Sequence, residues 1–262
     1  MLLDAFGICE EILASKKYAS LHRPLVLRIC EEEYSKYDND KERVKAAKNT
    51  LHTMYGAFLT AGIYKKAGKL LDQADELDSD KLKKMLHLHI STRERMSCLH
   101  EFYGFIFDNI KQPESVMDIG CGFNPFTLQC FPQKPAKYYA LDIDSRIADL
   151  NNRYFKSLGM PELAKCMDIA ADTPDITADA AFLFKLLPLI DRQAKGRSIK
   201  LLKETDAQFL VITYPTKSLT GKEKGMQTFY AAAFEETIKG NLFISAKKQI
   251  GHELVYIIDK SL

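Results

Sequence analysis

Over the first 110 residues, apolar positions repeat with the spacing of amphipathic helices. They recur three and four residues apart, and the strict alternation of a half-buried strand is absent from this stretch. Pro24 suits the first turn of one such helix, and STRE at residues 91–94 has the spacing of a capping box, which predicts a helix from there to about Asn109. We therefore expect an all-helical N-terminal domain over residues 1–110. The repeating positions are Ile8, Ile12 and Leu13, then Leu25, Val26 and Ile29, then Val44, Ala47, Leu51 and Met54.

From residue 116 onward the pattern changes. The short apolar runs SVMDIG, KYYALDID, LAKCMDI, DAAFLF and AQFLVITYP are typical of strands, and amphipathic segments at 146–158 and 189–205 lie between them. This order predicts a parallel sheet covered by helices. The last segment, NLFISAKKQIGHELVYIID, predicts a hairpin that turns near Gly251. We expect an α/β fold over residues 111–262: a doubly wound, Rossmann-like sheet ending in an antiparallel hairpin, as in class I methyltransferases.

Charge is distributed unevenly along the 262 residues, although the net charge is only +2. Residues 40–69 carry seven Lys and Arg against two acids, and residues 185–224 carry nine against four. The intervening residues 111–184 carry seven against ten. Basic segments on both sides of an acidic middle fit a nucleic-acid surface. Solvated helix faces explain the same charges equally well.

The six cysteines form no C-x-x-C pair and no Cys/His cluster with zinc spacing. This indicates a reduced, cytoplasmic protein without a structural metal. The N-terminus lacks the basic region of a signal peptide. The run AFLFKLLPLI is too short for a membrane span and contains Lys185 and Pro188, so we expect a soluble chain.

The glycine segment VMDIGCGFNPF follows the first expected strand. Glycines at this turn let the backbone approach a ligand closely, although a lone G-x-G is weak evidence. Asp118 precedes Gly120 and Gly122, and the third glycine of a dinucleotide site is replaced by Phe-Asn-Pro. Pro125 removes a donor that a pyrophosphate would need. S-adenosylmethionine carries no phosphate, so its binding does not need the donor that Pro125 removes.

Acidic residues follow the next two strands as well. Asp142 ends ALDID, where a carboxylate can accept hydrogen bonds from both ribose hydroxyls. Asp168 and Ile169 end CMDI, where an adenine amino group and ring face would lie. Each Asp alone could equally be a turn residue or a helix cap. The agreement of three strand ends favours S-adenosyl-L-methionine as the cofactor.

The chain resembles the aminoglycoside-resistance 16S ribosomal RNA methyltransferases, which modify guanine N7 in the decoding site. The likeness covers nearly the whole chain and departs from the family pattern at Tyr214 and at residues 227–229. It implies a helical domain that binds the 30S subunit and closes over the cofactor. The matching segments are ILASKKY (12–18), LH..YGAF (51–58), LHISTRER (88–95), DIGCGFNP (118–125), FKLLPL (184–189), YPTKSLTGKEKGM (214–226) and IGHELVYI (250–257).

The resemblance also implies roles for individual residues. Arg95 would bind the methionyl carboxylate, since guanidinium binds carboxylates bidentately, although it could instead be an exposed charge. Ser91 could be both a pocket residue and an N-cap. The implied cofactor residues are Phe58, His89, Ser91, Arg95, Gly120, Gly122, Asp142, Ile143, Asp168, Ile169, Phe184 and Gln193. The implied RNA-binding residues are Lys185, Pro215, Lys217, Lys222, Lys224 and Met226, with Lys45, Lys48, Lys65 and Lys66 extending the basic surface.

Guanine N7 carries a lone pair and no proton, so its methylation needs no catalytic base. We expect catalysis by positioning, with no dedicated catalytic residue and no metal. Methylation would give resistance to aminoglycosides of the gentamicin and kanamycin type. The alternatives are a methyltransferase acting on another RNA base or a small molecule, and a ribosome-binding protein without catalysis.

Overall fold

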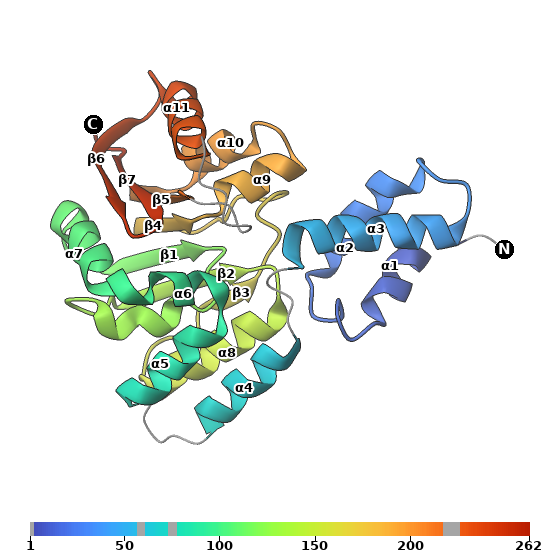
Figure 1. Cartoon of the computed structure of the whole chain (residues 1–262), viewed down its shortest axis with the longest axis horizontal. Helices are drawn as coiled ribbons and strands as arrows, with labels where there is room; N and C mark the ends of the chain where they lie inside the picture. The colour runs from blue at the N-terminus through green and yellow to red at the C-terminus, as the bar shows by residue number, and fades with distance from the viewer. Residues whose placement is uncertain (1–2, 57–60, 73–77, 217–225) are drawn as a thin grey trace.

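The computed structural model describes residues 3–56, 61–72, 78–216 and 226–262. Over these residues a seven-stranded sheet forms in the order β3-β2-β1-β4-β5-β7-β6 (Figure 1). Neighbours from β3 to β5 are parallel, and β7 runs antiparallel to both β5 and β6. The predicted sheet with a terminal hairpin is confirmed, and Gly251 lies in its turn with φ +55°. The strands are β1 (Ser115–Ile119), β2 (Lys137–Asp142), β3 (Ala164–Cys166), β4 (Ala178–Phe184), β5 (Ala207–Pro215), β6 (Phe243–Ile250) and β7 (Glu253–Asp259).

Successive strand residues point to opposite faces of the sheet, and both faces are buried. Phe182 belongs to the core on one face, whereas its neighbour Leu183 belongs to the core on the other. The first face is covered by α4 (Ala61–Asp72), α5 (Ser79–Leu88), α7 (Leu99–Ile110) and α8 (Ser145–Ser157). The second is covered by α9 (Leu187–Gln193), α10 (Arg197–Glu204) and α11 (Met226–Ile238).

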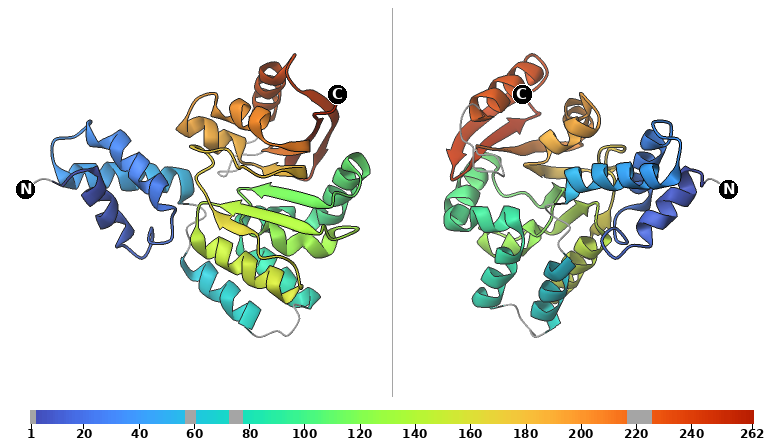
Figure 2. Two further views of the ribbon diagram at one scale, coloured as in Figure 1. Left: turned by 180° about the vertical axis from the view of Figure 1, so that it is seen from behind. Right: turned by 45° about the vertical axis from the view of Figure 1, so that its right-hand side comes forward.

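The first three helices pack around a separate core and form a lobe beside the sheet (Figure 2). They are α1 (Ala5–Leu13), α2 (Arg23–Tyr34), which has Pro24 in its first turn as predicted, and α3 (Asp40–Tyr55). The lobe joins the loop after β2 through two backbone hydrogen bonds, from His22 N to Ile143 O and from Ser145 N to Ser20 O. Since α4, α5 and α7 share a core with the sheet, a domain boundary at residue 110 stays a prediction.

Two predicted helices are interrupted. Residues 91–109 were expected to form one helix, but they are divided among α6 (Ile90–Arg95), the 3₁₀ turn η1 (Met96–Cys98) and α7. The predicted cap is also wrong, because Ser91 lies inside α6, and the N-cap residue is His89, whose side chain does not cap the helix. Residues 189–205 fall into α9 and α10, since Gly196 between them has φ +79°, outside the helical range.

Candidate cofactor site

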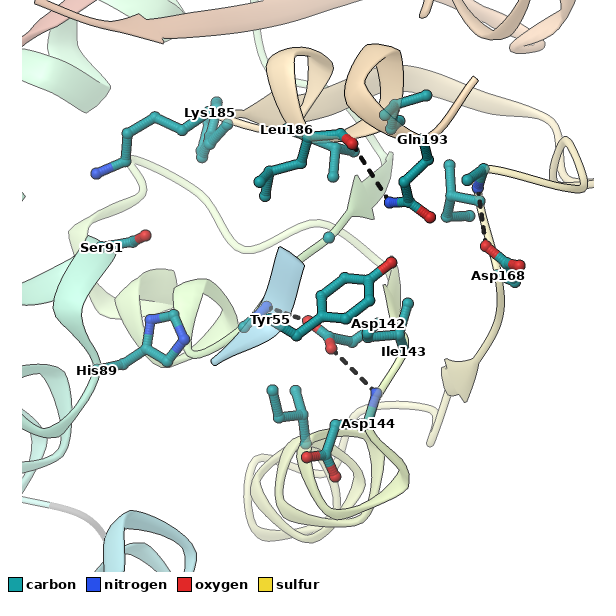
Figure 3. A pocket seen from close by; sticks show the side chains of 18 of the residues that line it. Tyr55, His89, Ser91, Asp142, Ile143, Asp144, Asp168, Lys185, Leu186 and Gln193 are labelled. Atoms are coloured by element: carbon teal, nitrogen blue, oxygen red, sulfur yellow. Dashed lines mark hydrogen bonds between the residues drawn. The ribbon is translucent and has the colours of Figure 1, made fainter. Parts of the chain in front are cut away.

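A pocket opens at the carboxyl ends of the parallel strands, where the strand order reverses between β1 and β4. Ligands of open α/β sheets bind at this position. Its empty space, with the open mouth included, is about 860 Å³. Side chains from the sheet and from the preceding helices point into it (Figure 3). The sequence-predicted residues that line it are His89, Ser91, Gly120, Gly122, Asp142, Ile143, Asp168, Ile169, Phe184, Lys185 and Gln193.

The turn after β1 requires its two glycines. Gly120 and Gly122 have φ +71° and +50°, a region that favours glycine. A Cβ at Gly120 would lie 2.9 Å from Leu186 Cδ1, and a Cβ at Gly122 would lie 2.9 Å from His89 Cε1. After the turn, Pro125 stands in the first turn of the 3₁₀ helix η2 (Asn124–Cys130), so the N-terminus of a long helix does not face the pocket here. The turn therefore offers close backbone approach without a phosphate cradle.

Asp142 at the end of β2 is held by backbone donors. Its Oδ2 accepts from Gly122 N at 2.9 Å and its Oδ1 from Asp144 N at 3.2 Å. Each oxygen keeps acceptor capacity beyond these bonds. Desolvation raises the pKa of Asp142 to about 6, although the two backbone donors oppose that shift. At pH 7 the side chain is an ionised acceptor for hydroxyl groups.

Asp168 and Ile169 lie just after β3 and are 2% and 4% exposed. Asp168 Oδ1 accepts from Ala170 N at 3.1 Å, which fixes the plane of the carboxylate. Arg197 holds the following turn by donating to the carbonyl oxygens of Ile169 and Ala170. An acceptor and an apolar side chain thus lie side by side, as an adenine edge and face would require.

His89 and Ser91 reach the pocket from α6 and the residue before it. His89 is buried and stacks on Phe123 with ring centroids 5.2 Å apart. Burial, and then the positive charges of Lys185 and Arg95, lower the pKa of His89 to about 4. The imidazole is therefore neutral at pH 7 and adds no repulsion toward a sulfonium ion.

Phe184 and Lys185 contribute the end of β4. Lys185 has φ +55°, which is rare for a residue other than glycine, and its N donates to Thr213 O at 3.0 Å. Its Nζ lies 2.7 Å from Glu94 Oε2 and 3.6 Å from Glu253 Oε1. The predicted RNA-binding lysine thus lines the pocket with its charge balanced by two carboxylates.

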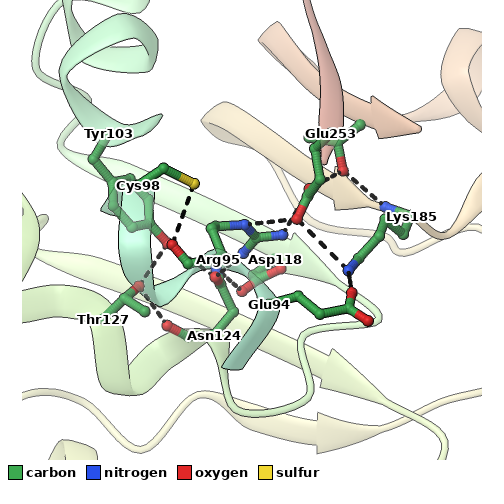
Figure 4. A network of polar contacts seen from close by, with 10 residues as sticks. Glu94, Arg95, Cys98, Tyr103, Asp118, Asn124, Thr127, Lys185 and Glu253 are labelled. Atoms are coloured by element: carbon green, nitrogen blue, oxygen red, sulfur yellow. Dashed lines mark hydrogen bonds and ion pairs between the residues drawn. The ribbon is translucent and has the colours of Figure 1, made fainter. Parts of the chain in front are cut away.

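Arg95 is buried beside Glu253 (Figure 4) and is not among the residues that line the pocket. Its Nε and Nη2 donate to the two carboxylate oxygens of Glu253 at 3.0 and 2.9 Å, and its Nη1 donates to Asn124 Oδ1 at 3.0 Å. The guanidinium also lies over the rings of Phe102 and Phe184. Arg95 does bind a carboxylate bidentately, but that carboxylate belongs to the protein, and a contact with the cofactor stays a prediction.

Sequence reasoning missed part of the pocket wall. Tyr55 from α3 and Tyr64 from α4 line it, and Tyr64 Oη donates to Asp144 Oδ2 at 3.0 Å. Tyr55 stands inside the matched segment LH..YGAF, which was the available signal for it. Tyr64 had no such signal. The other unpredicted lining residues are Asp144, Ile147, Ala170, Leu186, Leu189 and Ile190.

Several predicted residues are not placed at the pocket. Phe58, Lys217, Lys222 and Lys224 lie outside the described residues, and Met226 is described only as the start of α11. Pro215 ends β5 and pairs with Glu253. Over the described part of the chain, His, Cys, Asp and Glu form no group that could hold a metal ion. No helix in that part is long and apolar enough to cross a membrane.

Comparison with known proteins gives full-length matches. The chain is 36% identical to the 16S rRNA (guanine(1405)-N(7))-methyltransferase of Serratia marcescens over 250 residues, covering 95% of this chain and 96% of that protein. It is 31% identical to the enzyme of the same name from Micromonospora echinospora, covering 96% and 95%. The crystal structure of the 16S rRNA methyltransferase RmtF in complex with S-adenosyl-L-homocysteine superposes with a TM-score of 0.90 at 32% identity, covering 99% of both chains. The 16S rRNA methylase RmtB gives 0.86 at 32%, covering 99% and 100%.

A family model described as ribosomal RNA methyltransferase (FmrO) matches residues 14–257. The match takes in α2 and α3 of the N-terminal lobe, the glycine turn and most of the terminal hairpin. The chain therefore belongs to the ribosomal RNA methyltransferase (FmrO) family.

Proposed function

We propose that this protein transfers the methyl group of S-adenosyl-L-methionine to N7 of guanine 1405 in 16S rRNA, the activity for which its full-length relatives are named. The observation that carries the proposal is the pocket, in which a two-glycine turn and two strand-end carboxylates meet at the reversal of the sheet. This donor and acceptor set fits S-adenosyl-L-methionine. The turn needs glycine at both positions, because a Cβ would lie 2.9 Å from Leu186 at Gly120 and 2.9 Å from His89 at Gly122.

In this reading the pocket residues hold the cofactor by its separate parts. Asp142 accepts from the ribose hydroxyls, Asp168 accepts from the adenine amino group, and Ile169 covers the adenine ring. His89, Ser91 and Phe184 border the remainder of the pocket. When bound, the cofactor supplies an electrophilic methyl group on a sulfonium ion.

The chain's own task is to bind and orient, because guanine N7 has no proton to remove. Aligning two reacting atoms can supply roughly 7–11 kcal/mol of the barrier, so a general base is not required. The target base must leave its stack to reach the pocket. Lys185 at the pocket would meet the RNA, in line with its predicted role.

We further infer that the substrate is the 30S subunit, where the reaction takes place in the cytoplasm, and that the N-terminal helical region binds it. The exposed side chains of Lys45, Lys65 and Lys66 on α3 and α4 support this reading. Methylation removes N7 as an acceptor and adds positive charge at the decoding site. Cationic aminoglycosides of the gentamicin and kanamycin type would then bind less well.

The test is methyl transfer from labelled S-adenosyl-L-methionine to purified 30S subunits and to naked 16S rRNA, with the product mapped by N7-specific strand cleavage. The proposal expects cleavage at guanine 1405, on subunits more than on naked RNA, and none with D142A. Label at another base would retain the enzyme and reject the resistance role. If neither substrate takes label while the cofactor still binds, a small-molecule substrate or a non-catalytic role is favoured instead.

A further inference from the structure

Arg28 extends from α2 in the N-terminal lobe to the adenine end of the pocket. Its Nε and Nη2 donate to Asp168 Oδ2 at 3.1 and 2.9 Å, and Nη2 also donates to Gln193 Oε1 at 3.0 Å. Nη1 donates to Glu32 Oε1 at 3.0 Å, one turn further along α2. Two residues of the predicted cofactor site are thus held by one guanidinium from another part of the chain.

These contacts determine how Asp168 can meet a ligand. An ionised carboxylate accepts about four hydrogen bonds, two on each oxygen. Arg28 uses both positions of Oδ2, and Ala170 N uses one position of Oδ1. The capacity that remains is one acceptor position on Oδ1. Because Arg28 and Ala170 already donate to the buried carboxylate, Asp168 meets a ligand as an acceptor.

The same guanidinium orients Gln193. Its Oε1 accepts from Arg28, which directs its Nε2 toward Leu189 O at 3.3 Å. Arg28 therefore fixes the orientation of an acid and an amide that border the same part of the pocket.

We propose that Arg28 is a positioning residue that selects the purine of the cofactor. It presents Asp168 as an acceptor only, so a purine that donates through a 6-amino group is bound and one that carries a 6-carbonyl oxygen is rejected. This inference rests on the proposed function, since it requires an S-adenosyl cofactor in the pocket. The rival explanation is that the Arg28–Asp168 ion pair only ties the N-terminal lobe to the sheet.

The affinities of the full chain for two ligands, measured by calorimetry, distinguish these explanations. S-adenosyl-L-homocysteine carries the 6-amino group, and S-inosyl-L-homocysteine carries a 6-carbonyl in its place. The variants are R28M, which removes the charge, and R28K, which keeps the charge without the planar fork. R23M is the matched control, because Arg23 lies on the same helix and pairs with Glu10 at the surface.

The wild type should prefer S-adenosyl-L-homocysteine by at least about 100-fold, because a buried acceptor facing a carbonyl is left unpaired. R28M should bind it about 10- to 100-fold more weakly, the value of a charge-assisted hydrogen bond, while the preference between the two ligands shrinks. The affinity of R28K should fall between those of R28M and the wild type, and the affinity of R23M should equal that of the wild type. In methyl-transfer assays R28M should raise KM for the cofactor and leave kcat close to the wild-type value.

The preference is measured within one protein, so partial loss of folding in R28M would weaken both ligands equally and leave the ratio unchanged. An unchanged ratio, or unchanged affinity for S-adenosyl-L-homocysteine, would overturn the positioning role in favour of a plain tether. A wild type that binds neither ligand would reject the proposed cofactor together with this inference. If the wild type binds S-adenosyl-L-homocysteine and R28M keeps the same preference between the two ligands, this inference alone is rejected.

Discussion

Replacing Glu253 with Gln should destabilise the protein more than any change to a surface ion pair. Glu253 is 4% exposed and accepts from both Nε and Nη2 of Arg95, and its Oε2 also accepts from Thr213 Oγ1 at 2.7 Å. Lys185 Nζ lies 3.6 Å away. E253Q leaves the Arg95 charge beside a neutral amide that cannot balance it, whereas Lys185 keeps Glu94 as a partner.

The expected cost follows from what remains around Arg95. Breaking a buried ion pair by removing one partner costs about 3–5 kcal/mol. The low end applies here, because Asn124 and the rings of Phe102 and Phe184 still contact the guanidinium and the Gln oxygen can accept one bond. At roughly 2–4 °C per kcal/mol for a domain of about this size, a loss of about 3 kcal/mol lowers Tm by roughly 6–12 °C.

Thermal unfolding at pH 7 checks this, with E101Q as the control. Glu101 pairs with Lys248 at the surface, where a pair contributes about 0–1 kcal/mol, so E101Q should change Tm by only about 0–4 °C. The double variant R95M/E253M should be less destabilised than the sum of its single variants, because neither charge is then buried alone. A change in E253Q no larger than that in E101Q, or strict additivity in the double variant, would refute the reasoning.

The pH dependence gives a second check on the same pair. Burial alone would raise the pKa of Glu253, but Arg95 and Lys185 outweigh it and lower the pKa below its ordinary value of 4.5. A lowered pKa contributes stability that is present above pH 4.5 and is lost as the pH falls further. The destabilisation of E253Q relative to the wild type should therefore shrink in acid below pH 4.5, as measured by urea unfolding at each pH.

Three further results are expected. D142N should bind S-adenosyl-L-homocysteine about 10- to 100-fold more weakly by calorimetry, since a charged acceptor is lost; an affinity within twofold of the wild type would contradict the assignment of Asp142. G122A should abolish the binding of S-adenosyl-L-homocysteine, because its Cβ would meet the His89 ring and its φ of +50° disfavours Ala. An affinity of G122A equal to that of the wild type would contradict this. Burial raises the pKa of Asp118 to about 6 from an ordinary 3.8, so its contribution to stability is present below pH 3.8 and lost as the pH rises through 6. D118N should remove this part of the dependence of stability on pH. If the free energy of unfolding varies with pH in the same way for D118N and the wild type across pH 4–7, the prediction is wrong.

The strands could be predicted from the sequence because each is a short apolar run with a clear end. The carboxylates at those ends were predicted for the same reason, since parallel strands bring their carboxyl ends to one edge. Helix boundaries were less predictable. The STRE segment at residues 91–94 has the spacing of a capping box, yet Ser91 lies within α6 and lines the pocket, because tertiary packing moved the start of the helix.

The ion pairs of the site could not be read from the sequence, because local spacing does not record them. Arg95 and Glu253 are separated by 158 positions, and Arg28 and Asp168 by 140. Within its own segment, Arg95 has only Glu94 as a neighbouring acid, which fitted the alternative of an exposed charge. Only the docking of the terminal hairpin brings Glu253 to it.

Glu253 also connects this buried network to the pocket. It lies between Arg95, which is buried, and Lys185, which lines the pocket in a left-handed conformation. That conformation costs about 1–2 kcal/mol for a residue with a side chain. It persists because the backbone N of Lys185 bonds to Thr213 and its ammonium is paired at both carboxylates. E253Q should therefore loosen Lys185 as well as destabilise the fold, so methyl transfer to RNA should fall more in this variant than the binding of S-adenosyl-L-homocysteine.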